Sequence, residues 1–220
     1  MFEYTFQWRV VWQHLPELLE AAYLTIEITL LSIVIGLAIA IFLAAIQNSR
    51  FSTLRAIVIG WVALARNTPA LLQIYLAYFG LGVVGIHLSS YAAVLAAIAF
   101  NNAGYLTEIL RGGITSIPRN QNLAGLGLGL TAIQTYVYIL LPQVLKAVFL
   151  PITNQVVWAM LGTSLGMIIG LQELTGMTTF LQSQTFRPFE FYFVTACIYV
   201  VIAKLLTFSA RLAARKMFHG

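Results

Sequence analysis

Residues 28–49 read ITLLSIVIGLAIAIFLAAIQNS, a run of 22 residues without a charged side chain. A helix needs about 20 mainly apolar residues to cross the hydrocarbon core of a bilayer, so we expect a membrane span here, at about 21–46. The whole 220-residue chain has the same character, with 60% apolar and 9% charged residues and a mean hydropathy of +0.87. Soluble domains carry about 25% charged residues. The composition therefore excludes a soluble domain and a disordered chain, and it indicates an all-α membrane protein.

The same reasoning predicts four further spans, which with the first make five in a single membrane domain of residues 1–220. They are expected at about 68–82, 90–110, 143–162 and 190–211. The apolar stretch 53–84 is interrupted by Arg66-Asn67-Thr68-Pro69. Because proline is favoured at a helix start and breaks a helix interior, we expect 53–66 to be a separate interfacial helix.

Two other segments are predicted to lie at the membrane surface or to enter it only partly. The chain start, with Trp8 and Trp12, is expected to form a short amphipathic interfacial helix rather than a secretory signal, which would begin with basic residues. Residues 164–182 are interrupted by too many Gly and Thr residues for a span. We expect this segment to be re-entrant or to lie on the surface.

The basic residues predict the orientation. The chain has twelve Lys and Arg, seven Glu and no Asp. With an outside N-terminus and five spans, only Arg9 and Arg187 fall outside, whereas the cytoplasmic side collects Arg50, Arg55, Arg66, Arg111, Arg119, Lys146, Arg211, Arg215 and Lys216. Basic residues near span ends favour the cytoplasm, so the C-terminus is expected there. This bias also explains the net charge of +5 better than nucleic-acid binding, which needs clustered basic residues.

Uncharged polar side chains inside the spans are the candidate substrate-binding residues, because polar groups are costly in a membrane and often functional there. They are Thr68, Gln73, Asn101, Asn102, Tyr105, Asn154, Gln155, Thr163 and Ser164. Such a set suits a small polar solute better than a bare cation, although each residue could merely join helices. The spans lack an acid or histidine at mid-depth, which argues against a proton-driven transporter. Glu108 and Lys204 lie at comparable depth, and we hypothesise that they form an ion pair.

Two glycine patterns have structural interpretations. Gly162, Gly166 and Gly170 recur every four residues, and small residues on one helix face let membrane helices approach closely. The run from Gly125 to Gly129 lacks the strand, helix and acidic residue of a nucleotide-binding loop, so we interpret it as a flexible turn. Cys197 is the only cysteine, which leaves no intrachain disulfide.

Residues 113–142 form a long cytoplasmic segment with almost no charge, and loops of this size are usually functional. Its apolar residues include Leu123, Leu126, Leu128, Leu130 and Ile133. These side chains either pack on the chain's own helices or insert into a partner protein, and composition leaves both open.

Five motifs occur in order along nearly the whole chain. They are Leu15-Pro16-Glu17-Leu18-Leu19 with Thr25; Arg66-Asn67-Thr68-Pro69 with Gln73; Tyr105, Glu108 and Arg111-Gly112; Gln121, Gly129-Leu130 and Leu141-Pro142-Gln143; and Thr163-Ser164-Leu165 with Glu173-Leu174-Thr175. With these motifs the chain resembles the permease subunit of a type I ABC importer. It is most similar to the polar amino acid uptake branch, the histidine, glutamine and arginine permeases.

This resemblance implies a multi-pass protein of the bacterial cytoplasmic membrane that works by alternating access. Its implied partners are two cytoplasmic ATPase subunits, a second permease and an extracytoplasmic amino-acid-binding protein. The chain itself would hold no catalytic residue, metal or cofactor, since ATP and Mg²⁺ would bind to the ATPases. Segment 113–142 would couple to the ATPase through Gln121, Leu123, Ala124, Gly125 and Gly129.

The chain departs from the family pattern at two places. The family's glutamate-alanine-alanine falls on Leu123-Ala124-Gly125, and the charged pair that usually precedes Thr163 falls on Leu161-Gly162. A partner permease that retains these groups would compensate, so we predict a heterodimer. The alternatives are an importer of the same type for another small solute, a stand-alone channel, or an assembly subunit of a membrane complex.

Overall fold

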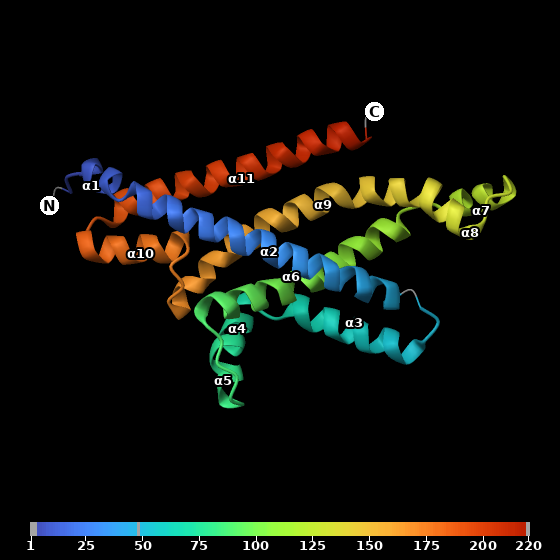
Figure 1. Cartoon of the computed structure of the whole chain (residues 1–220), viewed down its shortest axis with the longest axis horizontal. Coiled ribbons are helices and arrows are strands. Elements are labelled where there is room, and N and C mark those ends of the chain that lie inside the picture. Colours follow the sequence, from blue (N-terminus) through green and yellow to red (C-terminus); the bar gives the residue numbers. More distant parts are fainter. Residues whose placement is uncertain (1–3, 48, 219–220) are drawn as a thin grey trace.

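The computed structural model describes residues 4–47 and 49–218, and every regular element within them is a helix. The longer helices are α2 (Leu15–Gln47), α3 (Ser52–Asn67), α6 (Ser90–Thr115), α9 (Leu141–Gly162) and α11 (Pro188–Phe218). The shorter ones are α1 (Trp8–Gln13), α4 (Ala70–Tyr75), η1 (Leu76–Gly80), α5 (Leu81–Val83), α7 (Arg119–Gly127), α8 (Ala132–Thr135), η2 (Tyr136–Leu140), η3 (Thr163–Ile169) and α10 (Leu174–Thr185). Figure 1 shows the long helices aligned along one elongated bundle.

The helices bear out the expected membrane protein. Four helical stretches are long and apolar enough to cross a bilayer: Leu15–Gln47, Ser90–Thr115, Ala132–Ile169 and Pro188–Met217. A fifth candidate is the bent pair of α3 with Ala70–Val83, whose halves meet at 103°. The first span begins at Leu15 rather than near residue 21, because Pro16 lies in the first turn, where a proline costs no hydrogen bond.

Residues 164–182, which we expected to be re-entrant or to lie on the surface, divide between two helices. The 3-10 helix η3 continues from α9 and ends at Gly170, whose φ is +79°. Glycine adopts this left-handed conformation without steric cost. The chain then reverses into α10, where the Glu173 side chain caps the helix by accepting a bond from the Gly176 N–H.

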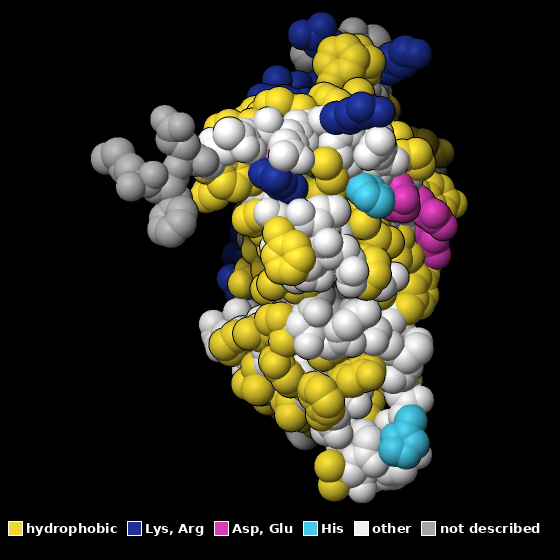
Figure 2. Space-filling view, turned by 90° about the vertical axis from the view of Figure 1, so that its left-hand side faces the viewer, with side chains coloured by type: hydrophobic (Ala, Val, Ile, Leu, Met, Phe, Trp, Pro, Cys, Tyr) yellow, Lys and Arg dark blue, Asp and Glu magenta, His cyan; other side chains and the backbone are white. Residues whose placement is uncertain are grey.

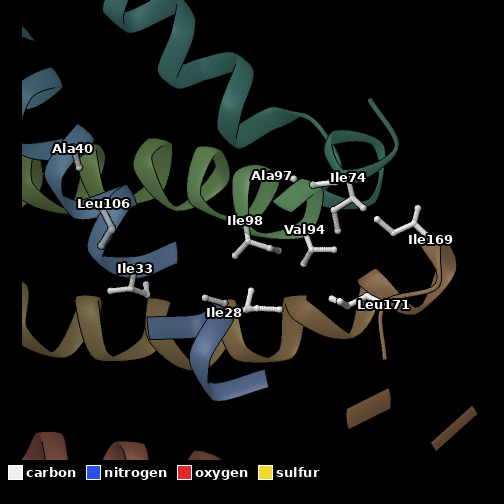
Figure 3. Packing of buried hydrophobic residues seen from close by; sticks show 12 residues of the cluster. Ile28, Ile33, Ala40, Ile74, Val94, Ala97, Ile98, Leu106, Ile169 and Leu171 are labelled. Carbon is white, nitrogen blue, oxygen red and sulfur yellow. The ribbon is translucent and has the colours of Figure 1, made fainter. Parts of the chain in front are cut away.

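Helix α6 occupies the centre of the bundle and packs most extensively on α2. Figure 3 shows α6 residues Val94, Ile98 and Leu106 surrounded by side chains of neighbouring helices, including Ile28 and Ile33 of α2. A Cβ atom on Gly36 would lie 2.8 Å from the Asn102 Cβ. The two backbones therefore approach closely at this point, and only glycine fits on α2.

The spacing of glycines in 162–170 is only partly explained by helix packing. Gly162 and Gly166 face α6, with ideal Cβ positions 3.3 Å from Ile98 and 2.8 Å from Val94. Gly170, by contrast, has open space around it and ends η3. The predicted close approach is confirmed for the first two glycines and wrong for the third.

A second core joins α1, α2, α10 and α11 around Leu18, Leu174 and Phe191. Next to it lies the fully buried Glu173, which accepts hydrogen bonds from Tyr199 Oη at 2.9 Å and Thr25 Oγ1 at 3.4 Å. This carboxyl group links α10 to α2 and α11.

Apolar side chains cover most of the outer surface of the bundle. Figure 2 looks at the end of the bundle that carries α1 and α10, where yellow hydrophobic groups alternate with white groups and the charged side chains lie mainly in the upper half of the view. Exposed apolar residues of α2 include Val34, Ile41 and Phe42, each more than half exposed. Such a surface is stable in lipid, where apolar side chains face the acyl chains.

Candidate functional site

The sharp bend between α3 and α4 lies at the predicted Arg66-Asn67-Thr68-Pro69 motif. Helix α3 ends at Asn67, Thr68 and Pro69 adopt extended conformations, and α4 begins at Ala70. A bend of 103° in an apolar helix pair leaves backbone carbonyls without helical donors. In a bilayer these groups must find partners within the protein.

Polar side chains satisfy the carbonyls that the bend releases. The Ala65 carbonyl has no helical donor because the residue four positions on is Pro69, which lacks an N–H. It accepts instead from Gln73 Nε2 at 2.9 Å and from Asn101 Nδ2 at 3.2 Å. The Leu64 carbonyl accepts from Thr68 Oγ1 at 2.8 Å. Tyr105 Oη also donates to the Arg66 carbonyl at 3.2 Å. Four of the predicted binding residues thus meet at the bend: Thr68, Gln73, Asn101 and Tyr105.

A second polar cluster joins α6 to α2 and α9. Asn102 Nδ2 donates to Ser32 Oγ at 3.2 Å, and Asn102 Oδ1 accepts from Gln155 Nε2 at 2.8 Å. Asn102 and Ser32 are fully buried, and Gln155 is 8% exposed. Three helices are therefore held together by uncharged hydrogen bonds inside the apolar bundle.

The charged groups near the bend contradict the hypothesised Glu108–Lys204 pair. Glu108 pairs with Arg111 at 2.7 Å and with Arg66 at 3.5 Å. Lys204 is exposed on α11, which packs mainly on α9 and α10 rather than on α6. The two residues were paired because they lie at similar depth in the predicted spans. Depth alone does not specify which helix faces point toward each other.

Arg66 and its neighbours form a partly open surface beside the bend. The Arg66 guanidinium lies 5.3 Å from the centre of the Tyr105 ring, which is 5.9 Å from Trp158 of α9. The side chains of Arg66 and Arg111 are 40% and 47% exposed. Ionisable residues within spans usually face a partner or an aqueous cavity, so this face is not suited to lipid.

The remaining predicted binding residues are not part of these clusters. Asn154 is exposed on α9. Thr163 and Ser164 lie in η3, where their hydroxyls donate to the carbonyls of Met160 and Leu161.

An open cavity of about 410 Å³ lies against the bend. Thr68 and Gln73 contribute its polar atoms, and Leu64, Leu72, Ala97 and Phe100 are among its apolar lining residues. A wall of this composition accommodates hydrocarbon groups and offers few hydrogen-bond partners.

Residues 119–140 form an arm, made of α7, α8 and η2, that projects from one end of the bundle (Figure 1). Several apolar side chains of the arm are largely exposed, including Leu123 at 67%, Leu128 at 80% and Ile133 at 77%. Most of the surface of these three side chains is left uncovered by the described helices. Of the two possibilities open from composition, self-packing is therefore excluded for these three residues.

The arm is an ordered helical hairpin, which corrects the prediction of a flexible turn for the Gly125–Gly129 run. Gly125 lies inside α7 and is buried against Thr135, whose Cγ2 would be 2.5 Å from an added Cβ. Gly129 turns the chain with a φ of +83°. Thr131 and Gln134 then form a reciprocal cap at the start of α8.

Sequence reasoning missed Ser32 and Trp158 as parts of these clusters. Ser32 lies four residues from Gly36, on the same face of α2. That spacing could have indicated that Ser32 faces a neighbouring helix. Trp158 carried no signal, since an aromatic residue in a span is ordinary.

Comparison with known protein families places the chain. Residues 8–219 match the family model described as "Binding-protein-dependent transport system inner membrane component". The chain belongs to this family. The predicted permease subunit of an ABC importer is thereby confirmed, as is a multi-pass location in the inner membrane.

Individual relatives agree with this assignment. The chain is 29% identical to the glutamine transport system permease protein GlnP of Escherichia coli strain K12, over 96% of this chain and 98% of that protein. It is 32% identical to the octopine transport system permease protein OccM of Rhizobium meliloti, over 87% and 82% respectively. A solved structure titled "Crystal structure of an amino acid ABC transporter with histidines" matches with a TM-score of 0.91 and 27% identity, covering 97% of this chain and all of that one.

Proposed function

We propose that this chain imports a polar amino acid into the cytoplasm as one membrane subunit of an ATP-driven importer. The observation that carries the proposal is the family membership together with relatives whose names specify glutamine, octopine and arginine transport. The N-terminus lies outside and the C-terminus in the cytoplasm, as the basic residues predict. Alternating access moves the solute past the bend between α3 and α4.

The proposed partners follow from the family membership, and the exposed side chains of the arm support one of them. Two cytoplasmic ATPases bind ATP and Mg²⁺, and one of them docks on the arm, whose exposed Leu123, Leu128 and Ile133 support a protein partner. An extracytoplasmic binding protein delivers the amino acid. The second permease is a different chain, because position 123 here carries leucine instead of the acid typical of the family.

The geometry divides the nine candidate binding residues into two groups. Gln73, Asn101, Asn102, Gln155 and Thr163 are buried and bonded within the chain. We assign them to positioning the helices. Thr68, Tyr105, Asn154 and Ser164 are at least partly exposed, and we assign solute contact to Thr68, Tyr105 and Asn154.

Purification and uptake assays test the function. The tagged chain, extracted from its native membrane, should co-purify with an ATPase and a second permease. Liposomes containing that complex and the binding protein should accumulate one or more polar amino acids from a labelled panel, only with ATP inside. Uptake without ATP, or purification of the chain alone, would favour a channel. A complex with one kind of permease chain would overturn the heterodimer.

A further inference from the structure

Asn101 and Asn102 are adjacent in α6 but bind different parts of the molecule. Successive residues of an α-helix point about 100° apart, so the two side chains diverge. Asn101 reaches the bend through Gln73 Oε1 and the Ala65 carbonyl, at 3.1 and 3.2 Å. Asn102 reaches α9 through Gln155. One turn of α6 therefore connects the bend with α9.

The connection continues from α9 to the arm. Residues 132–169 are helical throughout, so α8, η2, α9 and η3 follow one another without an interruption. Gln155 lies 14 residues beyond the start of α9 at Leu141, a distance of about 21 Å along a helix. A displacement of the arm that tilts or rotates α9 thus moves the Gln155 amide relative to α6.

The bend is the element best suited to respond. Thr68 and Pro69 are extended, and among the described residues no backbone N–H bonds the Ala65 carbonyl to hold α3 and α4 at their angle. That carbonyl is held by the side chains of Gln73 and Asn101. Asn101 Oδ1 is buried and has no hydrogen-bond partner in the described part of the chain. An unused buried acceptor is rare in folded proteins, and another angle of the bend could satisfy it.

We propose that the Asn101–Asn102 pair is a positioning device that transmits movement of the arm and α9 to the bend between α3 and α4. It rests on the proposed function, since ATPase subunits would supply the movement. Gln155 and Asn102 act through Asn101 and Gln73, and they set the α3–α4 angle beside the cavity. They are positioning residues and need not touch the solute.

Spin labels on both sides of the bend test the proposal in the complete importer in liposomes. Ala63 of α3 and Val83 of α5 are exposed, and cysteines there can carry labels in a Cys197→Ser background. The distance between the labels is measured without nucleotide and after trapping with ATP and vanadate. We expect a shift in the parent protein and no shift in Gln155→Leu or Asn102→Leu. Transport of labelled glutamine or arginine per ATP hydrolysed should also fall several-fold.

Two matched variants separate transmission from general damage. Ser32→Ala removes the other bond of Asn102 but leaves its link to α9. Thr153→Val removes a buried hydroxyl of α9 that, within the described part of the chain, bonds to the Phe149 carbonyl of the same helix. Both should keep the nucleotide-dependent shift. If Asn102→Leu fails to fold, the label distance in Gln155→Leu alone tests the transmission proposal.

The failures of the two proposals differ. If the parent complex hydrolyses ATP and transports but its label distance does not change, or if Gln155→Leu shifts like the parent, the transmission proposal is wrong. If no ATPase assembles with the chain, the proposed function itself is wrong.

Discussion

A single proline explains why so many polar side chains gather on one side of α6. Pro69 lacks the N–H that would bond the Ala65 carbonyl, and Gln73 and Asn101 supply that bond instead. Leaving a buried acceptor unpaired costs about 1–3 kcal/mol. These amides therefore stabilise the bend, whatever their role in transport.

Glu173 gives a prediction for pH dependence. It lies between η3 and α10, outside the membrane-spanning helices, and its burial raises the pKa of the carboxyl above its usual value. Between the usual and the raised pKa, the folded chain holds a proton that the unfolded chain has lost. Stability therefore falls as pH rises through this window. Glu173→Gln cannot lose a proton, so the melting temperature of the detergent-solubilised variant should change less across the window. An equally steep profile would contradict this.

Glu108 gives a second prediction that separates the observed ion pairs from the hypothesised one. Glu108→Gln removes the carboxylate that pairs with Arg66 and Arg111. Hydrogen bonds to charged groups contribute about 1.5–3 kcal/mol and less when exposed. We expect a loss of about 1–2 kcal/mol, measured as a melting temperature lower by several degrees. Lys204→Gln serves as the control and should melt like the parent. An equal loss in both variants would argue for a connection between Glu108 and Lys204.

The helices themselves were largely predictable from apolar run length and from proline position. Helix α3 and the bend were expected at the right residues because Pro69 has a definite local effect. The division of residues 164–182 into η3 and α10 was not predicted, since a left-handed turn at Gly170 does not follow from apolar run length. The prediction of a flexible turn at the glycines of the arm was wrong for a related reason. Gly125 lies in α7 and is buried against Thr135, a contact that local sequence does not reveal.

The turn of the arm provides a matched test of glycine. Gly129 has a φ of +83°, whereas Gly127 lies in α7, and neither has a neighbouring atom that an added Cβ would meet. A left-handed residue other than glycine costs about 1–2 kcal/mol. Gly129→Ala should therefore loosen the arm and reduce ATPase binding. Gly127→Ala should leave binding unchanged, because alanine favours a helix. The check is the amount of ATPase that co-purifies with each variant, and equal amounts would contradict the prediction.

The arrangement of helix faces was the part of the molecule that the sequence did not reveal. The composition predicted that the protein faces lipid, and the positions of polar residues within the spans identified the candidate binding residues. Neither shows which side chains point into the bundle. Asn101 and Asn102 are adjacent in sequence and serve different contacts. Asn154 and Gln155 are likewise adjacent, and only Gln155 is buried. Such assignments depend on how α6 and α9 are rotated within the bundle.

The two ends of the molecule should differ in their effect on ATPase assembly. Ile133 is exposed on the arm, whereas Phe186 is exposed between α10 and α11, at the opposite end of the bundle (Figure 1). Ala124 is also exposed on α7, so a charge there disturbs docking without breaking the arm, unlike a charge at the buried Gly125. Burying an unpaired charge in an interface costs several kcal/mol. Ala124→Glu and Ile133→Glu should lower ATPase co-purification at least tenfold, because about 1.4 kcal/mol already changes binding tenfold.

Phe186→Glu is the control, and this variant should retain the ATPase although it also places a charge on an exposed apolar site. Membrane insertion of all three variants is compared by the amount of chain in the washed membrane fraction. Loss of the ATPase from Phe186→Glu alone would place the docking surface at the α10–α11 end and reverse the proposed orientation. Retention by all three would show that the apolar surface of the arm serves another purpose.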